Sequence, residues 1–164
     1  MIIVSDTTPI HYLILIQRES VLLAIFGKIV IPDAVVEELR HERTPVLVSD
    51  WIVNPPDWAL IKSAQTELTQ KISGLGRGET AAIALAIEEG ADAVLMDDRK
   101  AIREARINGL TVLTTFSVLE LAAARKLIDL EVVLDELSQT SFRMPPEEIL
   151  EEYLNRDRKR KFEA

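Results

Sequence analysis

The stretch Gly76–Glu104, GRGETAAIALAIEEGADAVLMDDRKAIRE, decides the fold of this chain. Its apolar residues recur first with helical spacing and then form a continuous run at Ala93–Met96, which predicts a helix, a short strand and a second helix. A continuous apolar run is typical of a strand that is covered on both faces of a sheet. Asp97 and Asp98 follow this strand directly, and Glu79 lies in the first turn of the preceding helix. Two carboxylates at the end of a buried strand are costly unless they serve a site.

Short apolar strands alternate with helices along the rest of the chain. Strands are expected at Ile2–Val4, Lys28–Ile31 and Thr111–Leu113, and Trp51–Val53 and Leu60–Ile61 are interpreted as short strands or covering segments. Repeated strand–helix units predict an α/β domain of three layers, in which a mostly parallel central sheet is joined by right-handed crossovers. The run at Ile2–Val4 has no polar alternation and is therefore expected at the centre of the sheet.

Several helix boundaries can be predicted from capping residues. Thr8 is expected to be the N-cap of the first helix, with Pro9 as its first residue, and Thr115 is expected to cap a later helix. A helix is also predicted over Ala64–Ile72, and Pro145–Pro146 begin a last, charged helix.

The composition is that of a single globular domain, with 164 residues, of which 48% are apolar and 28% charged. No apolar run approaches the roughly 18 residues of a membrane span, and Ile10–Ile16 is too short for one. Because Asp6 precedes this run and no basic N-terminal region is present, it is not expected to be a signal peptide. The absence of cysteine excludes disulfides and favours a cytoplasmic location. The net charge of −8 argues against a broad basic face but does not exclude a nuclease, because a carboxylate-rich metal site is itself negative.

Acidic residues stand where several of these elements meet. Asp6 follows the first strand as Asp97 and Asp98 follow a later one, and parallel strands place such positions on one edge of the sheet, where ligands bind. Glu38 and Glu79 lie on helices next to that edge. Carboxylates without histidine or cysteine are the ligands that Mg²⁺ and Mn²⁺ prefer. Such a centre can polarise a phosphate and generate hydroxide from water.

Each of these acids also has an ordinary structural interpretation. Asp6 suits a turn or a cap, Glu38 a solvated helix face, Glu79 the first turn of a helix, and Asp98 an N-cap. Their combined placement at strand ends and helix starts is what favours a site.

Two further features near the acids are less specific. The loop that contains Gly74, Gly76 and Gly78 follows a polar helix and lacks the Gly-Lys-Ser/Thr ending of a phosphate-binding loop, so it is interpreted as a flexible entry to the Glu79 helix. Basic residues that flank the acids could bind phosphates, although cations on a helix surface are commonly only solvated. These residues are Arg77, Arg99, Lys100 and Arg103.

Taken in order, these motifs resemble those of PIN domains. They are VSDTTP with Asp6, IPDAVVEEL with Glu38, GRGETAAIALA with Glu79, LMDDRKA with Asp97 and Asp98, and then GLTVLTTFSVLELA. The chain is most similar to the prokaryotic VapC-like branch, in a subgroup with Gly-Glu and Asp-Asp-Arg signatures. The similarity covers most of Ile2–Arg143, so we expect a PIN-like nuclease domain over residues 1–143 and a charged helix and tail over residues 144–164.

The resemblance implies a metal-dependent endoribonuclease that uses Mg²⁺ or Mn²⁺, is often a homodimer and, in toxin systems, is inhibited by an antitoxin protein. It implies a quartet of catalytic acids, with Thr115 positioning water or phosphate: Asp6, Glu38, Glu79 and Asp98. Asp97 is an additional acid of the subgroup, and the expected metal ligands are Asp6, Glu79, Asp97 and Asp98.

Some positions stay open or depart from the family pattern. Glu37 competes with Glu38 for one matching position, where the spacing to Leu39 favours Glu38. Asp98 aligns better than Asp97 with the late aspartate of the family, so Asp6 and Asp98 are expected to be the principal metal ligands. Glu79 stands where many members have aspartate, and Thr114 stands where glycine is expected.

The sequence therefore predicts an endoribonuclease that hydrolyses RNA phosphodiester bonds, with RNA as its substrate and a role as the toxin of a toxin–antitoxin pair. One alternative is a catalytically silent PIN-fold binding module. A second is an aspartyl-phosphate phosphohydrolase with Asp6 as nucleophile, although Thr8 stands where that class carries a second aspartate.

Overall fold

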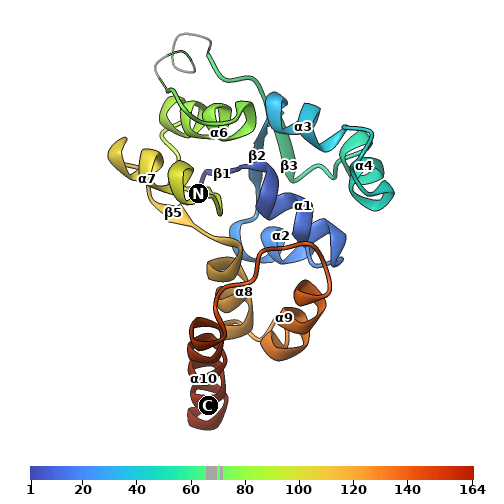
Figure 1. Ribbon diagram of the computed structural model, residues 1–164, viewed down its shortest axis with the longest axis vertical. Coiled ribbons are helices and arrows are strands. Elements are labelled where there is room, and N and C mark those ends of the chain that lie inside the picture. The colour runs from blue at the N-terminus through green and yellow to red at the C-terminus, as the bar shows by residue number, and fades with distance from the viewer. Residues whose placement is uncertain (66–69, 71) are drawn as a thin grey trace.

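The computed structural model describes residues 1–65, 70 and 72–164, so the helix expected over Ala64–Ile72 lies in part outside the described residues. A five-stranded parallel sheet forms the centre of the described part, in the order β3-β2-β1-β4-β5 (Figure 1). The strands are β1 (Ile3–Ser5), β2 (Ile29–Pro32), β3 (Ala59–Lys62), β4 (Ala93–Leu95) and β5 (Val112–Leu113). The prediction of an α/β fold with a parallel central sheet is confirmed.

Strand β1 is the middle strand, as its apolar sequence predicts. Val4 lies in register with Val30 of β2 and with Val94 of β4. Ile3 belongs to the larger of two hydrophobic cores and Val4 to the other, because successive side chains of a strand point to opposite faces of the sheet. The sheet is therefore buried on both faces, in agreement with its continuous apolar strands.

Helices cover both faces and complete the three layers. The bounds of those that precede the glycine-containing loop are α1 (Thr7–Leu15), α2 (Ser20–Phe26), α3 (Asp33–Leu39) and α4 (Val46–Val53). Those that follow it are α6 (Arg77–Glu88), α7 (Arg99–Ile107), α8 (Thr115–Ala124), α9 (Leu130–Ser138) and α10 (Glu147–Glu163). Buried residues of α1, α2, α8 and α9 share one core, whereas those of α6 and α7 share the other.

Three local predictions were wrong. Of the two interpretations of Trp51–Val53, the strand is wrong: these residues form the last turn of helix α4, in which Val48 and Ile52 recur with helical spacing and are both fully buried. Helix α1 begins at Thr7, so Asp6 and not Thr8 occupies its N-cap position. Helix α8 begins at Thr115, and its cap is Thr114, whose hydroxyl accepts a hydrogen bond from the Ser117 amide.

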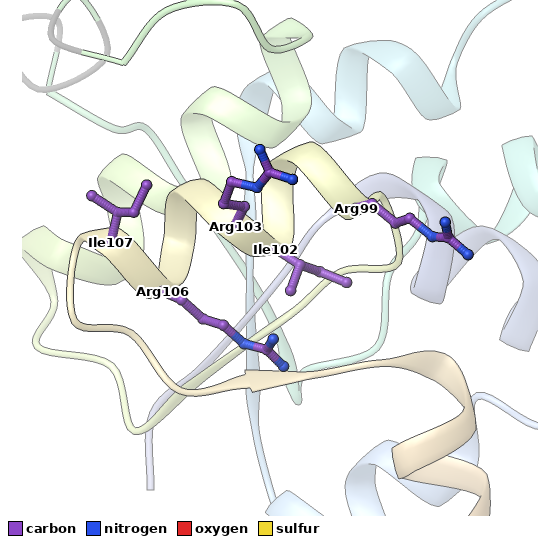
Figure 2. Close-up of a pocket in the computed structure, with 5 residues that line it drawn as sticks. All are labelled: Arg99, Ile102, Arg103, Arg106 and Ile107. Carbon is purple, nitrogen blue, oxygen red and sulfur yellow. The ribbon is translucent and has the colours of Figure 1, made fainter.

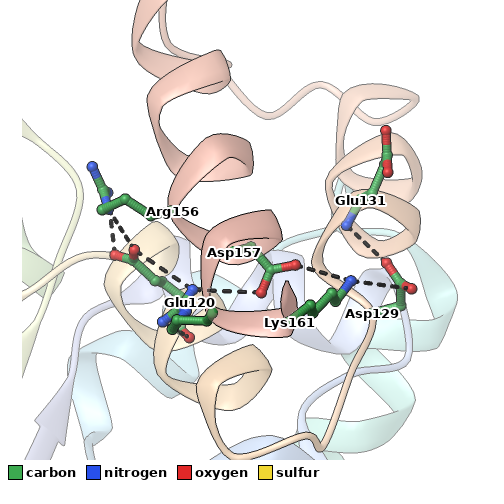
Figure 3. Close-up of polar contacts among 7 residues, drawn as sticks. Glu120, Asp129, Glu131, Arg156, Asp157 and Lys161 are labelled. Atoms are coloured by element: carbon green, nitrogen blue, oxygen red, sulfur yellow. Dashed lines mark hydrogen bonds and ion pairs between the residues drawn. The ribbon is translucent and has the colours of Figure 1, made fainter. Parts of the chain in front are cut away.

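Helix α10 extends beyond the layered body and packs against α8 and α9 (Figures 1 and 3). A cluster of charges holds it there. Asp157 is only 3% exposed and pairs with Lys161 at 3.0 Å, while Arg156 pairs with Glu120 of α8 at 2.7 Å. Lys161 also reaches Asp129, the N-cap of α9, at 3.4 Å. No helix in the described part of the chain is both long and apolar enough to cross a membrane.

Candidate metal centre at the carboxyl edge of the sheet

Asp6 lies at the end of the central strand and is 3% exposed. Its backbone amide donates to the Leu95 carbonyl at 2.9 Å, which extends the pairing of β1 with β4 and fixes where its side chain begins. Although Asp6 occupies the N-cap position of α1, its side chain makes no capping hydrogen bond. Its Oδ1 atom is buried and, among the described residues, has no hydrogen-bond partner. An unpartnered buried carboxylate oxygen is expensive, which points to a ligand for it.

The electrostatic surroundings of Asp6 are also unfavourable for its charge. The pKa of Asp6 is raised to about 7: burial raises it most, the nearby Thr7 amide lowers it, and the carboxylates of Glu79, Glu38 and Asp97 raise it further. These three acids therefore lie close enough to Asp6 to repel its charge. A cation among them would remove this repulsion.

Glu38 is held in place by two hydrogen bonds from separate elements. Thr7 donates its hydroxyl hydrogen to Oε2, and the Gly78 amide donates to Oε1 at 2.9 Å. A β-carbon at Gly78 would lie 2.6 Å from Glu38 Oε2 and 2.9 Å from its Cδ, so only glycine lets the carboxylate approach helix α6 this closely. Glu37, in contrast, turns toward the surface and pairs with Arg77 at 3.0 Å. Glu38 is thus the member of the pair that joins the acids.

Glu79 lies in the first turn of α6, as its sequence predicts. Its Oε2 accepts a hydrogen bond from the Gly76 amide at 3.0 Å, which closes the first turn. Burial raises the pKa of Glu79, the Gly76 amide lowers it, and the charges of Asp98 and Glu38 raise it.

Asp97 is fixed by helix α8. Thr115 donates its backbone amide to Asp97 Oδ1 at 2.9 Å and its hydroxyl to Oδ2 at 2.6 Å. Burial raises the pKa of Asp97, and these two hydrogen bonds lower it. Thr115 is fully buried. Its hydroxyl therefore acts on the site by orienting Asp97.

Asp98 has a different surrounding from its neighbour. It is the N-cap of α7, where its Oδ1 accepts hydrogen bonds from the amides of Lys100 at 2.9 Å and Ala101 at 3.0 Å. Its side chain is exposed, and its charge raises the pKa of Glu79. Of the two consecutive acids, Asp97 is the one whose charge raises the pKa of Asp6.

Glu38, Glu79 and Asp97 thus surround Asp6, but loosely. Within residues 1–65, 70 and 72–164, no three acidic or histidine side chains are close enough to hold a metal ion by themselves. Mg²⁺ is commonly held by one or two carboxylates and keeps several waters, and Mn²⁺ accepts the same oxygen ligands. The bare Oδ1 of Asp6 and its negative neighbours fit such an ion.

A groove of about 900 Å³ opens beside Asp97 and Asp98. Thr8 and Arg99 line its acidic end, while Phe116 and Phe142 belong to its aromatic part. The groove reaches the segment between α9 and α10. An acidic edge therefore continues into a surface with apolar rings, on which a planar group could lie.

Gly78 belongs to the site but was missed as a site residue by sequence reasoning, and the contact of Thr7 with Glu38 was not foreseen. The spacing GRGE placed Gly78 directly before Glu79, but nothing in the pattern shows that a carboxylate from α3 approaches it. Thr7 follows Asp6 directly, so its hydroxyl was near the site from the start, yet its contact with Glu38 depends on the packing of α1 against α3.

A family model described as a PIN domain matches residues 2–157. Among solved structures, the chain is similar to a PilT N-terminus domain protein from the hyperthermophilic archaeon Sulfolobus solfataricus P2, with a TM-score of 0.48 and 14% sequence identity. That similarity covers 88% of this chain and 100% of the other chain. No curated protein matches.

Proposed function

The chain belongs to the PIN-domain family, whose members are commonly nucleases, and on this premise we propose that it is an endoribonuclease that hydrolyses RNA phosphodiester bonds with Mg²⁺ or Mn²⁺. The observation that carries the proposal is the buried, unfavourable environment of the Asp6 carboxyl group. Its buried Oδ1 has no partner among the described residues, and three neighbouring carboxylates help to raise its pKa to about 7. A divalent cation would satisfy the oxygen and offset the repulsion in one step.

In this proposal Asp6 and Asp97 are the principal ligands, with Asp97 in place of the expected Asp98 because Asp98 caps α7. When bound, a divalent ion polarises the phosphodiester and lowers the pKa of water, which is the chemistry that hydrolysis needs. Thr115 keeps both oxygens of Asp97 in place through its amide and hydroxyl. Asp97 therefore keeps one orientation whether or not the ion is present.

Glu38 and Glu79 support this pair from the helices. The Gly78 amide and the Thr7 hydroxyl orient Glu38, and the Gly76 amide orients Glu79. In this proposal both acids bind water molecules around the ion. Asp98 stabilises the N-terminus of α7 and adds negative charge beside Glu79.

The physiological role proposed for the nuclease rests on the family resemblance. It comprises action in the cytoplasm, a homodimer and inhibition by an antitoxin protein as part of a toxin–antitoxin pair. A small reading frame immediately upstream of the gene whose product binds and inhibits the nuclease would support this role, and cleavage that proceeds unchanged with that product present would contradict it.

Cleavage of a fluorophore- and quencher-labelled RNA tests the proposed reaction. The wild-type protein should cleave it with Mn²⁺ and stop when the ion is chelated. Asp6→Asn should lower the rate at least about 100-fold, because a bound ion contributes several kcal/mol to such reactions. Asp50→Asn, which changes an exposed aspartate on α4, is the matched control.

The outcome separates the nuclease from a binding module. Full Mn²⁺-dependent cleavage by a folded Asp6→Asn protein would show that Asp6 is not a ligand. If titration calorimetry detects no binding of Mn²⁺ by the wild type at millimolar concentration, the catalytically silent alternative is correct.

A further inference from the structure

Helix α7 carries a stripe of cations along one side. Arg99, Arg103 and Arg106 follow one another at spacings of four and three residues, so they lie within about 60° around the helix and extend over about 10 Å. All three side chains are exposed. Together with Ile102 and Ile107 they line a shallow hollow of about 580 Å³ (Figure 2). We call the surface formed by these five residues the arginine face.

These arginines are not used to hold the fold together. Within the described part of the chain, none of the three forms an ion pair, whereas the arginines of α10 all pair with acids. Figure 2 shows the Arg103 and Arg106 side chains diverging from the two borders of this face of the helix. Three like charges on one helix repel one another, so their grouping is unfavourable unless an anion meets them.

The arginine face begins where the acidic site ends. Asp98 caps α7, the next residue is Arg99, and Arg99 lines both the hollow of the arginine face and the groove that contains Asp97. A polyanion bound along α7 would therefore have one end at the proposed metal centre. Because the chain has a net charge of −8, its overall charge repels RNA, and a local cationic track favours binding.

We propose that the arginine face binds the sugar–phosphate backbone of the RNA strand whose scissile phosphate lies at Asp6 and Asp97; the inference rests on the proposed function. Guanidinium groups match phosphate oxygens with two parallel hydrogen bonds. Ile102 and Ile107, the latter 71% exposed, provide apolar surface for sugars or bases between the charges. Contacts of this kind give affinity without reading the sequence.

The test is the affinity for a fluorescein-labelled single-stranded RNA, measured by anisotropy with the divalent ions chelated so that nothing is cleaved. Replacement of Arg99, Arg103 and Arg106 by glutamine should weaken binding at least tenfold at low salt. The slope of log Kd against log salt should become shallower by about 2, since each phosphate contact with a single strand contributes about 0.7. Circular dichroism checks that the variant keeps its helices.

The matched control replaces Lys28, Lys126 and Lys159, three exposed lysines outside α7, by glutamine. It changes the net charge by the same amount and should keep the slope of the wild type. If the arginine variant binds RNA as the control does, the inference is overturned. If a polyglutamate peptide binds the arginine face more tightly than RNA does, the inference is also overturned, in favour of an acidic protein partner.

Cleavage of the same RNA with Mn²⁺ separates this inference from the proposed function. A wild-type protein that binds RNA through the arginines but never cleaves it would contradict the nuclease and keep the binding surface. A protein that cleaves RNA and whose affinity is unchanged in the arginine variant would keep the nuclease and remove the surface.

Discussion

Replacement of Asp6 by asparagine should make the metal-free protein more stable at high pH. The unfolded chain has an ordinary aspartate, with a pKa of 3.8, whereas the pKa in the folded protein is about 7. A group whose folded pKa is raised contributes stability that is fully present below pH 3.8 and is lost as the pH rises through about 7. Asparagine does not ionise, so the unfolding free energy of the variant does not decrease in this way as the pH rises.

The size of the effect follows from the difference between the two pKa values. The folded value exceeds the unfolded value by about three units, and each unit corresponds to 1.36 kcal/mol, so the full penalty above pH 7 is about 4 kcal/mol. Part of it is already present at about pH 5, where the unfolded aspartate is ionised. Between about pH 5 and pH 8 the variant should therefore gain about 3 kcal/mol on the wild type. That is a large share of the stability of a domain of this size.

Denaturation in urea with a chelator present measures this difference. The quantity to compare is the change in unfolding free energy between the two pH values, because a constant offset from the amide group cancels. Added Mn²⁺ should then stabilise the wild type at about pH 8 and leave the variant nearly unchanged, since only a protein that binds the ion gains from it.

Asp50→Asn controls for the loss of one negative charge at an exposed position. It should follow the wild type across the whole pH range. If Asp6→Asn also follows the wild type, then Asp6 is not held as an unfavourable buried charge, and the reasoning that assigns a cation to it fails.

Three further substitutions test neighbouring contacts. Gly78→Ala should fold with little loss of stability but lower RNA cleavage about tenfold or more, because its β-carbon displaces the Glu38 carboxylate. Asp97→Asn should lower Mn²⁺-dependent cleavage at least about tenfold more than Asp98→Asn, since asparagine caps a helix as well as aspartate does. Asp157→Ala should reduce the unfolding free energy by about 1–3 kcal/mol in urea denaturation and leave cleavage unchanged, because it removes a buried partner of Lys161 (Figure 3).

Each of these has a result that would count against it. Cleavage by Gly78→Ala at the wild-type rate would mean that the position of Glu38 does not matter to the reaction. Equal losses for the Asp97 and Asp98 variants would remove the distinction between them. An Asp157→Ala protein as stable as the wild type would show that the charge cluster of α10 contributes little.

The sheet could be predicted from the sequence because its strands are apolar on both faces. Runs such as Ala93–Met96 are too short for helices and too apolar for the surface, so few arrangements other than a covered parallel sheet fit them. Helix α4 could not be predicted in the same way. Pro45, Pro55 and Pro56 break the pattern around it, and its burial comes from packing against α1 and α3, which the local sequence does not reveal.

The site could be anticipated only as a set of strand ends and helix starts. Parallel topology explains why Asp6 and Asp97, which are 91 residues apart, meet at one edge, since β1 and β4 pair directly. The two hydrogen bonds to Glu38 depend on how α1, α3 and α6 pack together, and the identity of their donors follows no sequence rule. From the sequence, Gly78 was therefore interpreted as a flexible loop residue. In the structure, its lack of a β-carbon lets the Glu38 carboxylate approach.

The choice between Asp97 and Asp98 shows why the sequence alone could not resolve the site. Consecutive residues at the end of a strand point in opposite directions, so the two acids cannot both face Asp6. In a strand that alternates polar and apolar residues, the alternation would show which acid points toward the site. Strand β4 is buried on both faces, so its sequence has no such alternation. In the structure, Thr115 holds Asp97 beside the central strand and Asp98 turns to cap α7. Asp97 therefore belongs to the proposed metal centre, whereas Asp98 anchors the helix that carries the arginine face. Asp98→Ala, which removes the cap, should therefore weaken RNA affinity more than it weakens the binding of Mn²⁺.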